Sequence, residues 1–135
     1  MADRRFAIYT RQSAEPRDGL SSCEAQFQTC LRYAQREPGA GNVWIGERFD
    51  DEGVSGRTLD RPALNRLRER VTAGAIDRVY AAALDRYSRN VTDTIQLLEE
   101  LERAGVEVHI AHQPELCSAP ESRLLRHILA SFAQF

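Results

Sequence analysis

The segment from Ile76 to Leu84 restricts the possible folds of this chain more than any other feature. It is a nearly continuous apolar run of strand length, followed by the charged residue Asp85. A strand with one exposed face would alternate apolar and polar residues, whereas a strand covered on both faces need not, as in the centre of a parallel sheet. The run therefore predicts a central strand of an α/β fold.

Other segments of strand length alternate with helix patterns along the chain. The expected strands are Arg5 to Thr10, Val43 to Phe49 and Val106 to Ala111, with a short edge strand considered around Pro114 to Cys117. Strands separated by helices imply right-handed crossovers and a mainly parallel sheet. We expect a three-layer α/β domain, with a parallel sheet of four to five strands and helices on both faces.

Capping residues and prolines mark the ends of the expected helices. Serine and asparagine favour helix starts, proline is accepted in the first turn, and glycine commonly ends a helix. The stretch from Asp50 to Asp60, rich in Asp, Gly and Ser, is expected to be a loop. The helices are expected from Ser21 or Ser22 to Pro38, from Pro62 to Gly74, and from Asn90 to Gly105.

A last helix is expected from about Pro120. Leu124, Ile128 and Phe132 lie along one line of it, and the apolar face continues to Phe135. We expect this helix to be truncated and normally to continue into a subunit interface, although packing of its first turns on the chain's own sheet is an alternative. The expected division is an α/β domain at residues 1–119 and the start of an oligomerisation helix at residues 120–135.

Composition places the chain among globular proteins. Of its 135 residues 42% are hydrophobic and 28% charged, and no apolar run reaches the length of a membrane span. The start of the chain lacks the apolar stretch of a signal peptide, so a cytoplasmic location is expected. The three cysteines show no metal-ligand spacing, and their odd number favours reduced thiols.

Charge argues against a free-standing DNA-binding domain. The net charge is -2, whereas nonspecific affinity for nucleic acid comes mainly from an excess of basic side chains. All 18 cationic residues are nevertheless arginine. Biased composition explains most of them, but within a motif the planar guanidinium has a chemical role, because it matches phosphate oxygens and stays protonated.

Three loops of the expected fold should emerge at one edge of the sheet. They carry Ser13 after the first strand, Asp51 to Arg61 after the second, and Asp85 to Arg89 after the third. In open parallel sheets, binding sites form beyond the carboxyl ends of the strands. A serine hydroxyl among the guanidinium groups of Arg11, Arg61, Arg86 and Arg89 would suit attack on a phosphodiester. A surface network of salt bridges with Asp50, Asp51, Asp60 and Asp85 is the competing interpretation.

The same residues resemble the catalytic domain of serine recombinases, the resolvase and invertase family. The family pattern Tyr-x-Arg-x-Ser is matched by Tyr9, Arg11 and Ser13, and its downstream glutamine by Gln26. The second block is matched at residues 49–56 and 61–64, and the third at residues 84–90. Ordered motifs over nearly the whole chain are a specific signal. The second block is most similar to that of large serine integrases and transposases.

The resemblance implies a catalytic role for several of these residues. Ser13 would attack a DNA phosphorus and form a 5'-phosphoserine link, without any cofactor or metal. Arg11, Arg86 and Arg89 would bind the scissile phosphate, with Arg61 assisting. The resemblance further implies that Gln26 and Asp85 orient these groups, and it makes Tyr9, Asp51 and Ser55 candidates of second rank for substrate binding. It identifies no proton acceptor for Ser13.

The resemblance also implies partners. The full-length protein would act on double-stranded DNA attachment sites, as a dimer on each site and a tetramer in the synapse, with DNA-binding domains downstream of the long helix. Two other functions stay open at this point. One is a serine-dependent phosphoesterase for small substrates, and the other is a noncatalytic regulatory module on the same fold.

Overall fold

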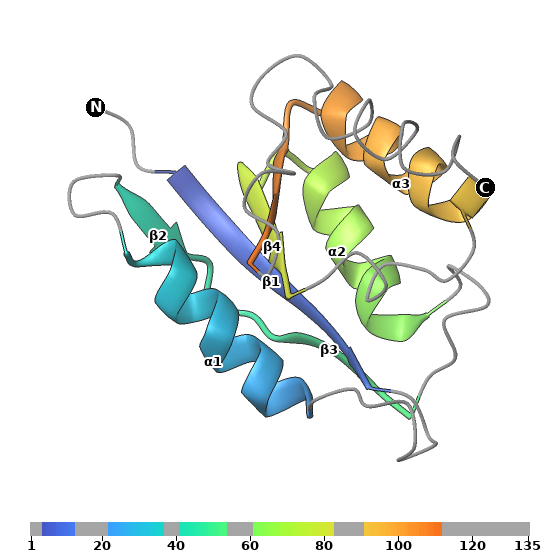
Figure 1. Ribbon diagram of the computed structural model, residues 1–135. Coiled ribbons are helices and arrows are strands. Elements are labelled where there is room, and N and C mark those ends of the chain that lie inside the picture. The colour runs from blue at the N-terminus through green and yellow to red at the C-terminus, as the bar shows by residue number, and fades with distance from the viewer. Residues whose placement is uncertain (1–3, 13–21, 37–40, 54–60, 83–90, 112–135) are drawn as a thin grey trace, which may run out of the picture.

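The computed structural model describes residues 4–12, 22–36, 41–53, 61–82 and 91–111, shown in colour in Figure 1. Strands and helices alternate for most of this length, as the sequence predicts. The elements are β1 (Arg4–Gln12), α1 (Cys23–Ala34), β2 (Asn42–Trp44), β3 (Phe49–Glu52), α2 (Pro62–Thr72), β4 (Arg78–Ala81), α3 (Val91–Arg103) and β5 (Glu107–Ile110).

The strands form a five-stranded sheet, and all pairings among the described residues are parallel. The order is β2-β1-β4-β5, and β3 also pairs with β1. β2 pairs along the first half of β1, from Arg4, whereas β3 pairs along the second half, up to Gln12. The α/β fold with a parallel sheet is therefore confirmed.

The expected single strand from Val43 to Phe49 is wrong, because the chain makes two strands there. β2 ends at Trp44, and Gly46 adopts a left-handed conformation with a φ of 85° that a strand cannot continue through. β3 then covers Phe49–Glu52, so the expected loop start at Asp50 is also wrong. The central strand β4 is shorter than the apolar run that predicted it.

The helices cover both faces of the sheet, with α1 on one side and α2 and α3 together on the other (Figure 1). Phe6 and Ile8 of β1 pack in the cluster with α1, while Ala7 and Tyr9 pack in the cluster with α2 and α3. Successive residues of a strand point to opposite faces, so β1 is buried on both sides. Like β4, it is an interior strand of the layered fold.

The expected helix starts at Ser22 and Pro62 and the expected ends near Gly74 and Gly105 agree with the structure, whereas α1 ends at Ala34, before the expected end at Pro38. Ser22 caps α1, and its hydroxyl oxygen accepts a hydrogen bond from the Ala25 backbone N–H at 3.1 Å. Gly74 and Gly105 follow α2 and α3 with φ angles of 76° and 79°. The expected cap Asn90, the edge strand near Pro114 and the last helix lie outside the described residues.

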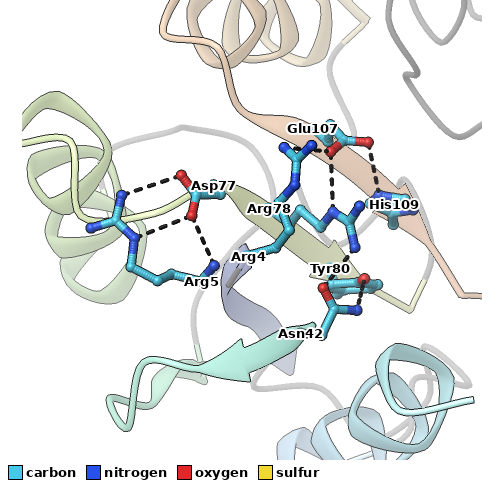
Figure 2. A network of polar contacts seen from close by, with 8 residues as sticks. All are labelled: Arg4, Arg5, Asn42, Asp77, Arg78, Tyr80, Glu107 and His109. Carbon is cyan, nitrogen blue, oxygen red and sulfur yellow. Dashed lines mark hydrogen bonds and ion pairs between the residues drawn. The ribbon is translucent and has the colours of Figure 1, made fainter. Parts of the chain in front are cut away.

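A polar network joins the ends at which the strands begin (Figure 2). Glu107 of β5 accepts a hydrogen bond from Arg78 of β4 at 3.1 Å, and Arg78 also donates to Asn42 of β2 at 2.6 Å. The ring of His109 stacks on Tyr80 with centroids 4.8 Å apart. These contacts belong to the amino edge of the sheet, away from the strand ends that carry the sequence motifs.

The opposite edge of the sheet gathers the carboxyl ends of β1, β3 and β4. β3 lies on one side of β1 and β4 on the other. The chain thus reverses its direction of travel across the sheet at β1, and such a switch point is where open α/β sheets form ligand sites. Ser13 follows the last residue of β1 in the sequence.

Candidate active site

Five of the ten predicted site residues are described, namely Tyr9, Arg11, Gln26, Asp51 and Arg61. The other five, Ser13, Ser55, Asp85, Arg86 and Arg89, lie outside the described residues. The described five come from β1, α1, β3 and the start of α2. Each is at most 2% exposed, so together they form a buried polar group beneath the carboxyl edge of the sheet.

Parallel pairing places three of these side chains on one face. Tyr9 and Arg11 are two residues apart on β1, and Arg11 is paired with Asp51 of β3. Residues two apart on a strand, and residues paired across parallel strands, point to the same side. This is the side covered by α2, because Tyr9 packs with Leu64 in one cluster.

Asp51 holds the N-terminus of α2. Its carboxylate accepts hydrogen bonds from the backbone N–H groups of Ala63 at 2.9 Å and Leu64 at 3.1 Å. A helix normally satisfies such N–H groups with the side chain of its own N-cap residue, but Arg61 at this N-cap makes no such bond. A buried carboxylate from β3 replaces it, and the positive end of the helix dipole favours that charge.

Arg61 reaches the same carboxylate through Tyr9. Its Nη1 donates to the Tyr9 hydroxyl oxygen at 2.8 Å, and the hydroxyl donates to Oδ2 of Asp51 at 2.8 Å. Burial raises the pKa of the Tyr9 phenol far above its ordinary value of 10.0, which keeps the phenol protonated as this chain of donors requires. The guanidinium is thereby fixed inside the protein at the start of α2.

Gln26 of α1 fixes the backbone of Arg11. Its side-chain Oε1 accepts from the Arg11 N–H at 3.2 Å, and its Nε2 donates to the Arg11 carbonyl oxygen at 2.8 Å. A primary amide can satisfy both backbone groups of one residue in this way. Two hydrogen bonds therefore connect the end of β1, just before Ser13 in the sequence, to the first turn of α1.

The sequence predicts that Arg11 and Arg61 contact a phosphate, but the structure buries both side chains. Arg11 and Arg61 are 0% exposed, so both guanidinium groups are interior in this structure. The competing prediction of a surface salt-bridge network describes Asp50, which pairs with Arg48 at 3.0 Å. It does not describe Asp51, which binds the Tyr9 hydroxyl and two backbone N–H groups in the interior.

Sequence reasoning missed Gln12, which lies between the two motif residues Arg11 and Ser13. Its Oε1 accepts a hydrogen bond from the Cys23 backbone N–H at 3.3 Å. The only signal in the sequence is a polar residue with a hydrogen-bonding side chain at the end of a buried strand.

Within the described ranges, no three His, Cys, Asp or Glu side chains are grouped as metal ligands would be.

Comparison with known families identifies the domain. Residues 6–135 match the family described as "Resolvase, N terminal domain". The chain belongs to this resolvase family. Among curated relatives, a Bacillus subtilis (strain 168) protein described as a DNA recombinase is 34% identical over 131 residues, 96% of this chain. The transposon Tn552 DNA-invertase BinR of Staphylococcus aureus is 34% identical over 113 residues, 82% of this chain.

The fold of this resolvase-family domain is also that of solved structures. The N-terminal catalytic domain of TP901-1 integrase is 28% identical, with a TM-score of 0.79 over 98% of this chain and 95% of that one. The chain spans 25% of the Bacillus relative and 58% of the invertase. None of the helices in the described ranges combines the length and apolar character needed to cross a membrane.

Proposed function

We propose that this resolvase-family chain is the catalytic domain of a site-specific DNA recombinase that cleaves and rejoins DNA through a phosphoserine at Ser13. Membership of the family supports the reaction class. The observation that carries the assignment to these residues is the buried polar group at the carboxyl end of β1. The last residue of this group on β1, Arg11, lies two positions before Ser13, and the group includes two guanidinium groups.

The proposed step is an in-line exchange at phosphorus. The Oγ of Ser13 forms a bond to the phosphorus as the bond to the 3' oxygen of the neighbouring nucleotide breaks. The serine proton passes to a base, and the departing oxygen takes up a proton to give a 3'-hydroxyl. Because the phosphoester is conserved, a 3'-hydroxyl can reverse the step and release Ser13 without a nucleotide cofactor.

Arginine is suited to the charge that develops in this step. We assign Arg11, Arg86 and Arg89 to the scissile phosphate, with assistance from Arg61. Fixed guanidinium donors stabilise charge best when they need no reorganisation, and loss of one such donor slows chemistry by roughly 10²–10³. The hydrogen bond of Arg61 to Tyr9 fixes one guanidinium, whereas the bonds of Gln26 fix only the backbone of Arg11. Both guanidinium groups are 0% exposed, so this assignment requires the carboxyl edge of the sheet to rearrange before a DNA phosphate can reach Arg11.

The remaining assignments concern the reaction's surroundings. Asp85 is assigned to orienting Arg86 and Arg89, and Ser55 to contact with substrate. The DNA partners are double-stranded attachment sites, bound by a dimer at each site and joined in a tetramer. We assign site recognition to domains downstream of residues 120–135, which accounts for the net charge of -2 of this chain. The 135 residues alone should then bind DNA weakly.

The proposal is tested by trapping the full-length protein on DNA. Duplexes that carry candidate attachment sites and a nick near the crossover are incubated with wild-type protein and with Ser13→Ala. We expect a covalent adduct at the 5' end with a free 3'-hydroxyl for the wild type, and none for Ser13→Ala. An adduct that persists in Ser13→Ala, or turnover of a small phosphodiester without any DNA adduct, would overturn the proposal.

A further inference from the structure

Gln12 ends β1 and contacts two other elements at the same edge of the sheet. Its backbone carbonyl oxygen accepts a hydrogen bond from Gly53 N–H at 2.6 Å, just after β3. Its side-chain Oε1 accepts from the Cys23 N–H at 3.3 Å, at the start of α1. One residue thus joins the end of β1 to the end of β3 and to the beginning of α1.

The Cys23 N–H belongs to a group that a helix cannot satisfy internally. The first N–H groups of any α-helix have no partner within the helix. The Ser22 cap satisfies the Ala25 N–H, and Gln12 satisfies that of Cys23. With the two bonds between Gln26 and the Arg11 backbone, three hydrogen bonds join the first turns of α1 to the last two residues of β1.

From this geometry we infer that Gln12 is a positioning residue that fixes the start of α1 against the end of β1, where the chain leads into Ser13. The inference rests on the proposed function. The contact joins Gln12, the residue that precedes Ser13 in the sequence, to Cys23 beside the α1 cap Ser22. Fixing the residue that leads into a nucleophile reduces the freedom that is lost when reacting groups are aligned.

The side chain of Gln12 contacts Cys23 through its Oε1 oxygen, so the test variants either remove or keep an oxygen acceptor at this position. Gln12→Met keeps the length of the side chain and removes the acceptor, whereas Gln12→Glu keeps an oxygen acceptor. Gln28→Met makes the same chemical change at an exposed position of α1 and serves as the matched control. The Cys23 side chain, 1% exposed, reports on the same helix start by its reaction with iodoacetamide.

Two readouts separate positioning from chemistry. The first is hydrogen exchange of the Cys23 N–H together with the rate of Cys23 alkylation, compared with Cys30. The second is the rate of adduct formation at saturating nicked duplex in the full-length protein, together with its affinity for that duplex. Hydrogen exchange and alkylation are measured without DNA, so their outcome does not depend on the proposed function.

We expect Gln12→Met to raise exchange and alkylation at Cys23 roughly fivefold, the effect of losing one ordinary hydrogen bond. Adduct formation should fall on the order of tenfold with unchanged affinity for the duplex, because misalignment affects the reacting state. Gln12→Glu should restore both rates, and Gln28→Met should change neither.

Three results would overturn the inference. Unchanged exchange and alkylation at Cys23 in Gln12→Met would show that the contact does not fix the helix start. Altered exchange with an unchanged rate of adduct formation would show that the helix start does not position the reacting groups. Absence of any adduct in wild-type protein would overturn the proposed function, and the role in the reaction with it, while the exchange data would still decide the contact.

Discussion

Replacing Asp51 by alanine should destabilise the domain more than any surface change. The carboxylate accepts three hydrogen bonds, from the Tyr9 hydroxyl and from the N–H groups of Ala63 and Leu64, and the residue is 2% exposed. Loss of a helix cap costs about 1 kcal/mol. The Tyr9 hydroxyl loses Asp51 as its acceptor, which costs about 1–3 kcal/mol more. The buried guanidinium of Arg61, which donates to the Tyr9 hydroxyl, also loses the negative charge of Asp51 on the far side of that hydroxyl.

We expect Asp51→Ala to lower the free energy of unfolding by about 3–5 kcal/mol, the range found when one partner of a buried charged group is removed. Domains have about 5–15 kcal/mol in total, so the variant should unfold at clearly lower urea concentration. The assay is urea denaturation followed by circular dichroism. Asp51→Asn, which keeps one oxygen acceptor, should fall between the variant and the wild type.

The neighbouring residue Asp50 provides the matched control. It lies on the same strand but is half-buried, and its carboxylate pairs with Arg48 at 3.0 Å and accepts a hydrogen bond from the Thr10 hydroxyl. Partly exposed pairs contribute about 0–1 kcal/mol and one ordinary hydrogen bond about 1 kcal/mol, so Asp50→Ala should cost less than Asp51→Ala. A cost for Asp51→Ala below about 1 kcal/mol, or no greater than that of Asp50→Ala, would refute the view that this carboxylate holds the start of α2.

Three further outcomes follow from the same structure. Gln26→Ala should lower the free energy of unfolding by about 2 kcal/mol, because the Arg11 N–H and carbonyl lose their hydrogen bonds to the Gln26 side chain. An equal loss in Gln28→Ala, at the exposed glutamine of α1, would contradict this prediction. The hydrogen bond from Arg68 holds the pKa of Glu100 below its ordinary value of 4.5. The contribution of this pair to the stability of the folded protein is therefore complete above pH 4.5 and is lost on acidification below the lowered pKa. The urea midpoint of Glu100→Gln should therefore fall less with acidification than that of the wild type. Equal dependence of the two midpoints on pH would contradict a stabilising Arg68–Glu100 pair. Burial raises the pKa of Cys30 to about 12, so its alkylation at mildly alkaline pH should follow global unfolding, and rapid labelling of the native protein would contradict the buried position.

Much of the fold could be predicted because its signals are local. The apolar run after Gly74 predicts a central strand, and the structure places β4 there, buried between two layers. Ser22 and Pro62 mark helix starts through their own hydrogen-bonding chemistry and ring geometry. The break at Gly46 was missed, since an isolated glycine in an apolar segment fits a strand interior as well as a left-handed turn.

The candidate site could be predicted as a set of residues but not as a set of contacts. Topology brings Arg11 and Asp51 side by side, because both lie near the ends of neighbouring parallel strands. It does not reveal that Asp51 caps α2, nor that Tyr9 lies between Asp51 and Arg61. Those contacts depend on the register of β3 against β1 and on where α2 begins, and both are set by tertiary packing.

The central claim is that Ser13 forms the covalent bond to DNA, and peptide mapping of the trapped adduct tests it most directly. Full-length protein is trapped on nicked duplex, digested with protease and nuclease, and the nucleotide-bearing peptide is sequenced by mass spectrometry. We predict a phosphoester at Ser13, linked to the 5' end of the cleaved strand. Attachment at any other residue, or cleavage that leaves a free 5'-phosphate and no linked peptide, would contradict the account.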